Sequence, residues 1–385
     1  MRPISVVSVL SRLTERIVIR TFFTPSLNTL PCLSNQFAYR PTSSTTAALI
    51  ALLDKITFLL RTNPFVIILS FDYSKGFDTL SHASVARGLS MLNIPDSIHN
   101  WSLDFLNYCS HRTALKGELS DSAHISAGVI QGSVMGPTLF NFAASTLAPI
   151  SPANSFFKYA DDGYLVVPGN NIDSIPQELV HHKNWATEQN LKLNLSKTSE
   201  IVFHSTRSKP QPPAPPSTPG VFRINEMTIL GVLVDDRLNF QPHINSSVSS
   251  CAQALFALKT LRHHGLSEES LRLTFTSKVL PKLTYASCAW WGFITEGARN
   301  QLEGFLRKAI RFNYYSTSQP TFSQFVDDQE SNLYHSITTN PHHCLHYLLP
   351  PLKTNHYNVR KRGHGYELPV KDNRNFIIRA LYRFV

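Results

Sequence analysis

The first half of the chain alternates between short apolar runs and stretches of helical spacing. Residues 65–71 (FVIILSF) form a nearly unbroken apolar run, which predicts a strand buried on both faces. Residues 156–160 and 164–167 predict two more strands, and the Asp-Asp-Gly between them predicts a hairpin turn. Helical patterns flank these strands at residues 45–60, 84–92, 97–108 and 176–189. This half therefore predicts a domain that combines helices with a sheet.

A proline-rich stretch, KPQPPAPPSTPG at residues 209–220, predicts an extended linker or a long exposed loop. Residues 221–234 predict a second hairpin, and the pattern after it is helical. The predicted helices cover residues 243–264, 268–280 and 298–312, the last with Leu302, Phe305, Leu306 and Ala309 on one face.

Composition narrows the class of protein. Hydrophobic residues make up 42% of the 385 residues, which allows a sizeable core, and the net charge of +10 predicts a basic face for a polyanion. Composition alone does not separate nucleic acid from an acidic membrane. The five cysteines include no CxxC pair, which argues against a disulfide framework and a zinc ribbon. Since no apolar run approaches the roughly 18 residues that span a bilayer, we expect no membrane partner.

The N-terminal stretch is basic and rich in serine. Its arginines are Arg2, Arg12, Arg16 and Arg20, and its apolar residues Val6, Leu10, Leu13 and Ile17 follow a helical spacing. Such a pattern is typical of an organelle transit peptide, and equally of an amphipathic basic helix that belongs to the fold.

Acidic residues stand at the ends of the predicted strands. Asp161 and Asp162 occupy the tip of the hairpin FFKYADDGYLVV, and Asp72 ends the buried strand before it. A bare Asp-Asp pair is often a solvated turn, but adjacent carboxylates repel each other unless a cation lies between them. Three carboxylates on the ends of adjacent strands are suited to binding two Mg²⁺ ions for displacement at phosphorus.

Several motifs in a fixed order resemble the reverse transcriptase of non-LTR (LINE-type) retrotransposons. The central ones are FDYSKGFDTLSH (71–82), GVIQGSVMGPTLFN (128–141) and YADD (159–162). The remaining matches are residues 2–18 and 36–49 (fingers), 190–198 (palm), 229–240 (primer-grip hairpin), 279–292 (thumb), and 340–351 and 375–384 (C-terminal segment).

The resemblance implies an α+β, right-hand polymerase fold. It has fingers, palm and thumb, a central antiparallel palm sheet, a helical thumb and a basic C-terminal tail. The implied domains are fingers and palm at 1–240 with the proline-rich insertion 209–220, a thumb-like region at 241–315, and a basic segment at 316–385. Neither an upstream fingers extension nor an endonuclease domain matches, so we expect an N-terminally truncated chain.

The resemblance also implies roles at the metal site. Asp72, Asp161 and Asp162 would hold two Mg²⁺ ions, or Mn²⁺ in their place, with help from the Tyr73 carbonyl. Lys197 matches the position of a general acid for pyrophosphate, although a solvated lysine is the alternative.

Further positions match the family's nucleotide pocket. Phe77 would exclude a ribose 2′-OH, or would merely pack in the core. Gln131 and Gly132 would contact the incoming nucleotide and the template. Arg40 would clamp the triphosphate, and Arg12 stands where the family often has lysine.

The implied function is RNA-directed DNA polymerase, with an RNA template, a DNA primer or target, and dNTPs as partners and no small-molecule cofactor. The alternative is a catalytically impaired remnant that only binds nucleic acid. The family's mechanism implies action in the nucleus, where the basic run Arg360-Lys361-Arg362 would suit import. Because residues 2–18 match the fingers motif, the interpretation of the N-terminal stretch as a mitochondrial transit peptide is disfavoured.

Two features of the C-terminal region have more than one interpretation. Residues 353–385 carry eight basic residues against Glu367 and Asp372, which predicts salt-dependent contacts with phosphates. The alternative is that the apolar residues of this tail pack on the thumb, namely Tyr357, Phe376, Ile377, Leu381 and Tyr382. Histidines and a cysteine also cluster here as candidate zinc ligands, at His342, His343, Cys344 and His346.

Overall fold

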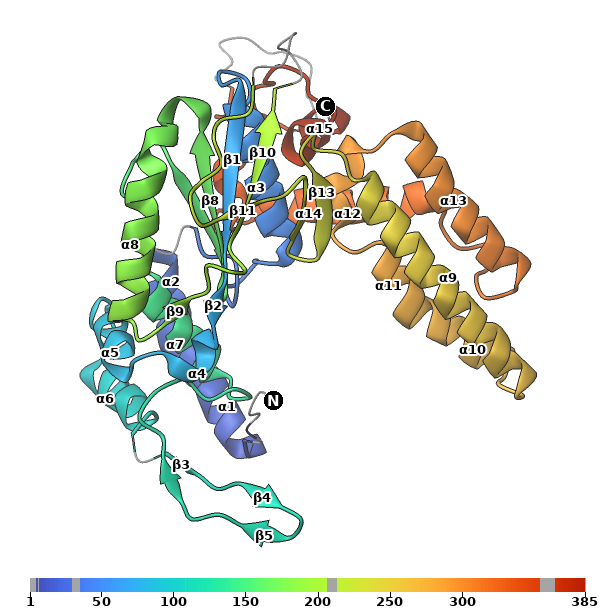
Figure 1. The fold of residues 1–385 in the computed structure, drawn as a ribbon. Coiled ribbons are helices and arrows are strands. Elements are labelled where there is room, and N and C mark those ends of the chain that lie inside the picture. The colour runs from blue at the N-terminus through green and yellow to red at the C-terminus, as the bar shows by residue number, and fades with distance from the viewer. Residues whose placement is uncertain are drawn as a thin grey trace. The chain divides into compact units, whose positions relative to one another are not determined.

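A computed structural model describes residues 5, 7–29, 35–107, 109–205, 213–353 and 364–384. The chain divides into two compact units. Figure 1 shows their helices and strands, coloured from the N-terminus to the C-terminus. The first unit comprises Met1–Ser43, Phe65–Glu200 and Pro213–Arg223. The second unit comprises Ser44–Pro64, Ile201–Pro212 and Ile224–Val385. Within the described residues, no helix combines the length and the apolar character that crossing a membrane requires.

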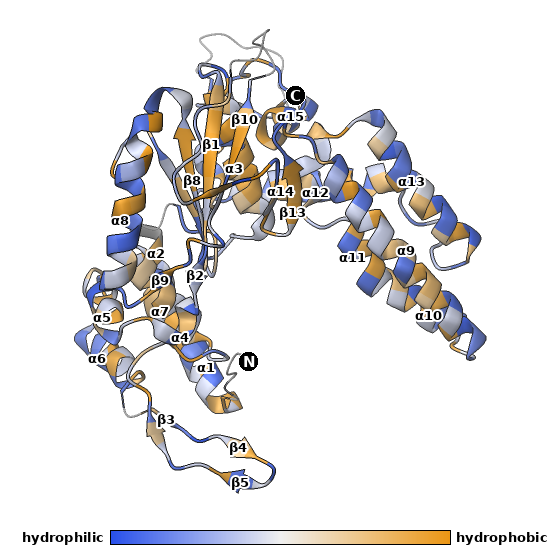
Figure 2. Cartoon of the chain, in the orientation of Figure 1, coloured by the Kyte–Doolittle hydropathy of each residue, from blue (hydrophilic) through white to orange (hydrophobic). Residues whose placement is uncertain are grey.

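The sheet of the first unit is built on the apolar run predicted as a buried strand. This run forms β1 (Phe65–Phe71), and it pairs antiparallel with β8 (Asp162–Pro168), which pairs antiparallel with β7 (Ser155–Tyr159). Six of the seven β1 residues are buried, and Figure 2 shows hydrophobic colouring along most of the strand. The predicted α+β class is confirmed, and the pairings among these three strands are antiparallel as predicted, although the sheet as a whole is mixed.

Several helices belong to the first unit. One of them, α8 (Ile175–Glu188), packs on the sheet through His182, whose ring stacks on Phe71 at 4.3 Å and meets Phe156 edge-on at 4.7 Å. The others are α1 (Val9–Val18), the π-helical turn η1 (Ile19–Phe23), α2 (Thr24–Thr29), α4 (Gly76–Thr79), α5 (His82–Ser90), α6 (Asp96–Asp104), α7 (Met135–Ala144) and the 3₁₀ segment η3 (Gly169–Ser174).

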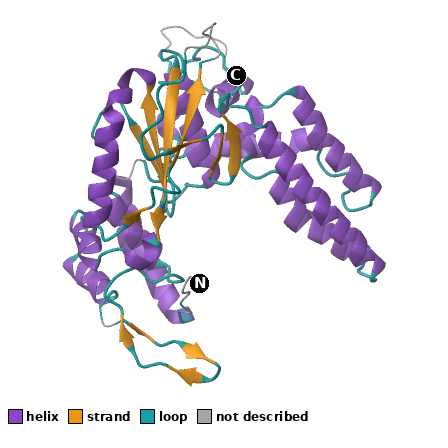
Figure 3. Cartoon of the chain, viewed as in Figure 1, coloured by secondary structure: helices purple, strands orange, loops and turns teal. Residues whose placement is uncertain are grey.

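An exposed hairpin arm follows α6 in the chain. Its strands are short and every residue in them is exposed, and Figure 3 shows them projecting from the helices. They are β3 (Ser110–His111), β4 (Ala114–Leu115), β5 (Glu118–Leu119) and β6 (Ala123–His124), with β3 paired to β6 and β4 to β5. The sequence patterns did not predict this arm, because its strands are two residues long and carry no apolar alternation.

The end of the proline-rich stretch is docked in the first unit. Residues 213–218 have no regular structure, yet buried Glu200 accepts hydrogen bonds from both the amide and the hydroxyl of Thr218. Arg223 forms an ion pair with Glu200 at 2.7 Å and donates to the Pro215 and Pro216 carbonyls. Residues 209–212 lie outside the described residues.

Short strands complete the first unit. β10 (Ser199–His204) runs parallel to β11 (Phe222–Arg223), and the boundary between the two units lies within β10. β2 (Tyr73–Ser74) pairs antiparallel with β9 (Lys192–Leu193). The predicted hairpin at 221–234 is therefore shifted, because 222–223 pair with β10 and the hairpin itself is β12 (Glu226–Ile229) with β13 (Val232–Asp235) in the second unit.

The second unit is mostly helical. The predicted face of α13 (Glu296–Arg311) is confirmed, since Leu302, Phe305, Leu306 and Ala309 are all buried. The other helices are α3 (Thr45–Leu59), α9 (Gln241–His263), α10 (Glu268–Thr274), the π-helical η4 (Phe275–Val279), α11 (Leu280–Leu283), α12 (Ser287–Trp290), η5 (Trp291–Phe293), α14 (Phe322–Thr339), η6 (His346–Leu348) and α15 (Phe376–Arg383).

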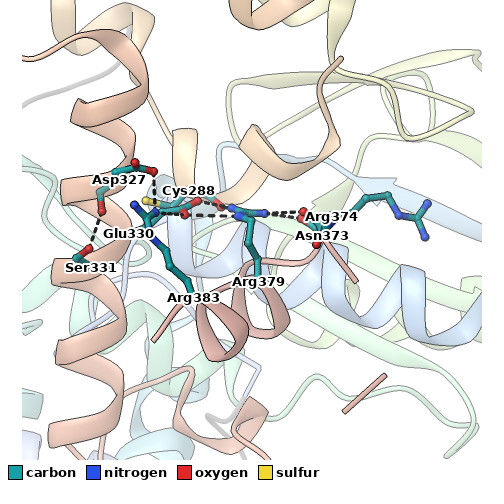
Figure 4. Close-up of polar contacts among 8 residues, drawn as sticks. All are labelled: Cys288, Asp327, Glu330, Ser331, Asn373, Arg374, Arg379 and Arg383. Carbon is teal, nitrogen blue, oxygen red and sulfur yellow. Dashed lines mark hydrogen bonds and ion pairs between the residues drawn. The ribbon is translucent and has the colours of Figure 1, made fainter. Parts of the chain in front are cut away.

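The C-terminal helix α15 is anchored within the second unit by an ion-pair cluster, which we define as Arg379, Arg383, Asp327 and Glu330 (Figure 4). Arg379 pairs with buried Glu330 and donates to the Arg374 carbonyl at 2.8 Å. Arg383 pairs with Asp327 at 2.6 Å.

This packing agrees with the alternative for the C-terminal tail, in which its apolar residues pack in the fold, while the salt-dependent contacts with phosphates stay a prediction. Two of its arginines are neutralised by acids of α14, and Phe376, Ile377 and Leu381 are buried, as the packing alternative expected. Gly292 allows the C-terminal tail to pack closely against it, because a Cβ at residue 292 would lie 2.3 Å from the Arg374 carbonyl oxygen. Tyr357 and Arg360-Lys361-Arg362 lie outside the described residues.

Candidate active site

Three aspartates lie at the same end of the central strands. Asp72 directly follows β1, Asp161 lies in the turn between β7 and β8, and Asp162 is the first residue of β8. Phe71 pairs with Gly163, so one further step along the same register sets Asp72 across from Asp162. We call Asp72, Asp161 and Asp162 the carboxylate edge. Although the chain separates Asp72 from the other two, the antiparallel pairing brings them to one end of the sheet.

The carboxylate edge is electrostatically strained. The pKa of Asp162 is raised to about 6, first by burial of its carboxyl group and then by the negative charges of Asp161 and Asp72. Taken as a whole residue, Asp162 is nevertheless exposed. The charges of Asp161 and Asp72 make ionisation of Asp162 harder, and a bound cation would remove that penalty.

The donor set suits a hard divalent cation, because Mg²⁺ prefers carboxylate oxygens. In the part of the chain that the structure describes, however, no three acidic, histidine or cysteine groups form a ready metal cluster. This holds for the carboxylate edge and also for the candidate zinc ligands. His343 instead accepts a hydrogen bond from the Leu345 amide at 3.1 Å, and burial lowers the pKa of His343.

Lys197 lies next to Asp72. The segment 190–198 is held there because the Asn194 amide donates to the Asp72 carbonyl at 2.9 Å. Lys197 Nζ is 3.9 Å from Asp72 Oδ2, with the two side chains 69% and 41% exposed. Such an exposed pair contributes about 0–1 kcal/mol, so Lys197 is free to swing toward another anion.

A pocket of about 300 Å³ opens beside the carboxylate edge. It brings together Phe77, Gln131 and Gly132 with Asp161, and it does not include Arg40 or Arg12. Its wall is formed by Tyr39, Lys75, Gly76, Phe77, Asp78, Ile130, Gln131, Gly132, Pro137 and Asp161.

Phe77 contacts a core residue and also lines the pocket, so its position fits both of its alternative roles, core packing and exclusion of a ribose 2′-OH. Its ring stacks on Phe140 of α7 at 4.4 Å with an interplanar angle of 16°, and it meets Tyr39 edge-on at 6.4 Å. It is half-buried and also lines the pocket. Tyr39 lines the same pocket as Asp161. Burial and then the charge of Asp161 raise the pKa of Tyr39. Phe77 is therefore an aromatic wall held from behind by Phe140.

Gln131 and Gly132 are fixed by contacts within the protein. Gln131 Nε2 donates to Asp78 Oδ1 at 2.5 Å, and the Gln131 carbonyl accepts from the Ser5 amide at 2.8 Å. Gly132 has a φ of 105°, and a Cβ there would lie 2.2 Å from the Ser5 carbonyl oxygen. Close approach of the N-terminal backbone thus explains the glycine without any ligand.

The two predicted arginines lie outside the pocket wall. Arg40 donates from Nη1 to the Gln36 carbonyl at 3.3 Å. Arg12, on α1, buries its Nε, and this atom has no acceptor among the residues that the structure describes.

Tyr73 is buried beneath the carboxylate edge. Its hydroxyl lies 3.3 Å from His182 Nδ1, and burial raises the pKa of Tyr73. The pKa of His182 is lowered to about 3, by burial first and then by the charges of His181 and Lys158, so this histidine is neutral. Sequence reasoning missed His182. The spacing of the buried α8 residues Glu178, His182 and Trp185 is the signal that indicates its inward face.

The comparisons with known proteins point in one direction. A sequence profile described as "Reverse transcriptase (RNA-dependent DNA polymerase)" matches residues 1–234. The RNA-directed DNA polymerase from mobile element jockey of Drosophila melanogaster is 24% identical over 316 residues, which cover 77% of this chain and 33% of that protein. The probable RNA-directed DNA polymerase from transposon BS of Drosophila melanogaster is 25% identical over 327 residues, 80% of this chain and 36% of that protein. The chain thus spans about a third of the length of these curated relatives.

Other matches are more distant. The retrovirus-related Pol polyprotein from type-1 retrotransposable element R2 of Popillia japonica is 25% identical over 162 residues, which cover 39% of this chain and 26% of that protein. Among solved structures, apo telomerase from Candida tropicalis has a TM-score of 0.49 and 15% identity, covering 78% of this chain and 51% of that one. The resemblance to the polymerases of non-LTR retrotransposons is confirmed by the profile and the curated relatives. Because the profile covers more than half of the residues, the chain belongs to the reverse transcriptase family.

Proposed function

We propose that the chain is an RNA-directed DNA polymerase that adds dNTPs to a primer 3′-OH. The observation that carries this proposal is the carboxylate edge beside the pocket, with Asp161 belonging to both. A nucleotide in this pocket would present its α-phosphate to the acids. The family profile supports the same chemistry.

The carboxylate edge, with the Tyr73 carbonyl, would hold two Mg²⁺ ions, and Mn²⁺ would accept the same oxygen donors. When bound, these ions would activate the primer 3′-OH and neutralise charge on the α-phosphate and the leaving pyrophosphate. The raised pKa of Asp162 fits this role, because a cation would offset both of its causes, first the burial of the carboxyl group and then the repulsion from Asp161 and Asp72.

The chain's own residues would select and orient the nucleotide. The Phe77 ring, supported by Phe140, would exclude a ribose 2′-OH, and Gln131 and Gly132 would border the base and the template. Lys197, close to Asp72 and exposed, would give its proton to pyrophosphate. Arg40 and Arg12 would have to turn toward the pocket to hold the triphosphate.

The partners that follow are an RNA template, a DNA primer or target, and dNTPs. We propose action in the nucleus because a DNA target would be found there. The basic run at 360–362 that would suit import lies outside the described residues.

Primer extension on poly(rA)/oligo(dT) with Mg²⁺ tests the proposal. The Asp161→Asn, Asp162→Asn double variant should lose at least about a hundredfold in rate, because it removes charge at the reacting phosphate. The matched control is Asp121→Asn, which removes one exposed carboxylate from the hairpin arm and should leave the rate unchanged. A wild-type chain that binds the template and primer but does not extend would favour the catalytically impaired remnant.

A further inference from the structure

A buried acid on the N-terminal helix α1 reaches the start of α7. Glu15 is 1% exposed, and its Oε2 accepts hydrogen bonds from the amides of Val134 at 2.7 Å and Met135 at 2.9 Å. Its Oε1 accepts from the Ser11 hydroxyl at 3.0 Å. A carboxylate removed from water is costly without such donors, so these three bonds explain why a charge is tolerated here.

Charged groups hold α7 at both of its ends. The first amides of a helix have no partner within the helix, and negative charge near them also offsets the helix dipole. Glu15 meets both requirements at the N-terminus. At the other end, buried Lys158 donates from Nζ to the carbonyls of Ala144 at 2.9 Å and Leu147 at 3.0 Å. The position of α7 along its axis is thus fixed by two oppositely charged side chains.

α7 and the turn before it form one wall of the pocket. Gln131, Gly132 and Pro137 line the pocket, and Phe140 is the ring on which Phe77 stacks. The amides that Glu15 binds lie between Gly132 and Pro137. A shift at these amides would therefore move both the turn and the ring behind Phe77.

We propose that Glu15 is a positioning residue of the nucleotide pocket: by accepting from Val134 and Met135 it fixes the wall that binds dNTP. This inference rests on the proposed function. It assigns Glu15 no contact with the nucleotide.

Steady-state primer extension with varied dNTP tests the inference. Glu15→Ala leaves the part-buried Val134 amide and the buried Met135 amide without this acceptor and should raise the KM for dNTP about tenfold, with kcat and the KM for primer-template nearly unchanged. Glu15→Gln keeps a carbonyl oxygen for both amides and should remain within about threefold of wild type.

Glu178 provides a matched control. It is also fully buried on a helix and accepts from two consecutive amides, those of Ile150 at 3.1 Å and Ser151 at 3.0 Å, but none of these residues lines the pocket. Glu178→Ala should lower stability without changing the KM for dNTP. If Glu15→Ala leaves this KM unchanged, or if Glu178→Ala raises it equally, the inference is wrong.

Hydrogen exchange separates this inference from the proposed function. Absence of extension by the wild-type chain would defeat the proposed function but would not affect the exchange measurement. Glu15→Ala should then still speed exchange at Val134 and Met135, relative to the amides of β1, and should weaken equilibrium binding of labelled dTTP. Exchange at Val134 and Met135 that matches wild type would overturn the inference even in an active enzyme.

Discussion

The carboxylate edge of the first unit gathers like charges, whereas the ion-pair cluster of the second unit pairs opposite charges. At the carboxylate edge, burial and then the charges of Asp161 and Asp72 raise the pKa of Asp162, and the exposed Lys197 lies 3.9 Å from Asp72. In the ion-pair cluster, Arg379 meets the buried Glu330, and further carbonyl oxygens accept from the same guanidinium.

The difference separates a structural role from a functional one. Breaking a buried, matched ion pair leaves one charge without a partner, so the pair is tied to the fold. Like charges that repel each other lower the stability of the folded protein. A cation that binds between them would offset this repulsion. Perturbed pKa values of this kind are typical of functional sites.

The largest expected effect is on the ion-pair cluster. Glu330→Gln should lower the free energy of unfolding by about 3–5 kcal/mol, because Arg379 would lose its buried partner charge. Urea unfolding measures this change. The matched control is Glu268→Gln, which breaks an exposed pair with Arg272 and should cost under about 1 kcal/mol.

Urea unfolding of the Asp162→Asn variant compares the carboxylate edge directly with the ion-pair cluster. Removing one of three repelling charges should leave the free energy of unfolding unchanged or raise it at neutral pH. A loss for Asp162→Asn as large as that for Glu330→Gln would show that the carboxylate edge is a structural cluster, and the contrast between the two regions would disappear.

A smaller effect is expected at the pocket wall beside the carboxylate edge. Phe77→Ala should weaken discrimination against rNTPs by at least about tenfold, because the ring's bulk would no longer meet the 2′-OH. Incorporation assays with paired dNTP and rNTP measure the ratio. Phe77→Tyr retains the bulk and should retain discrimination. Unchanged selection in Phe77→Ala would mean that the stack on Phe140 is only core packing.

The smallest effect concerns Gly76, which lines the pocket together with Asp161. A Cβ at Gly76 would lie 3.5 Å from both Asp161 Cβ and the Phe140 ring, which is ordinary contact. Gly76→Ala should therefore stabilise the protein by about 0.5–1 kcal/mol through the unfolded chain. Gly132→Ala should destabilise it, because Ser5 and the positive φ leave no room. A destabilising Gly76→Ala would indicate that the backbone beside Asp161 needs glycine.

Much of the fold was predictable because its signals are local. The apolar run at 65–71 matches β1, and the strands predicted around Asp161-Asp162 match β7 and β8 closely. The helix predicted at 45–60 is α3. The exposed hairpin arm carries no such periodicity, and its strands are defined by pairing alone.

The candidate site was predictable only in part. The resemblance named Phe77, Gln131 and Gly132, which the structure gathers in one pocket with Asp161. It could not indicate that Glu15, Lys158 and His182 are buried, because a charged or polar residue is tolerated inside only through partners distant in sequence. Glu15 and Val134, for example, are 119 positions apart. Such contacts are properties of the tertiary structure.

The pKa of Asp162, measured with and without Mg²⁺, tests most directly whether the carboxylate edge is a metal site. Carbon-13 NMR of labelled aspartates follows its titration. Without metal the pKa should be about 6, and stability should therefore fall as the pH rises from about 4 to 6, since the unfolded chain releases this proton earlier. Added Mg²⁺ should lower the pKa of Asp162, and Asp161→Asn should lower it without metal. A pKa near the ordinary value of about 4 that does not change with Mg²⁺ would contradict the account.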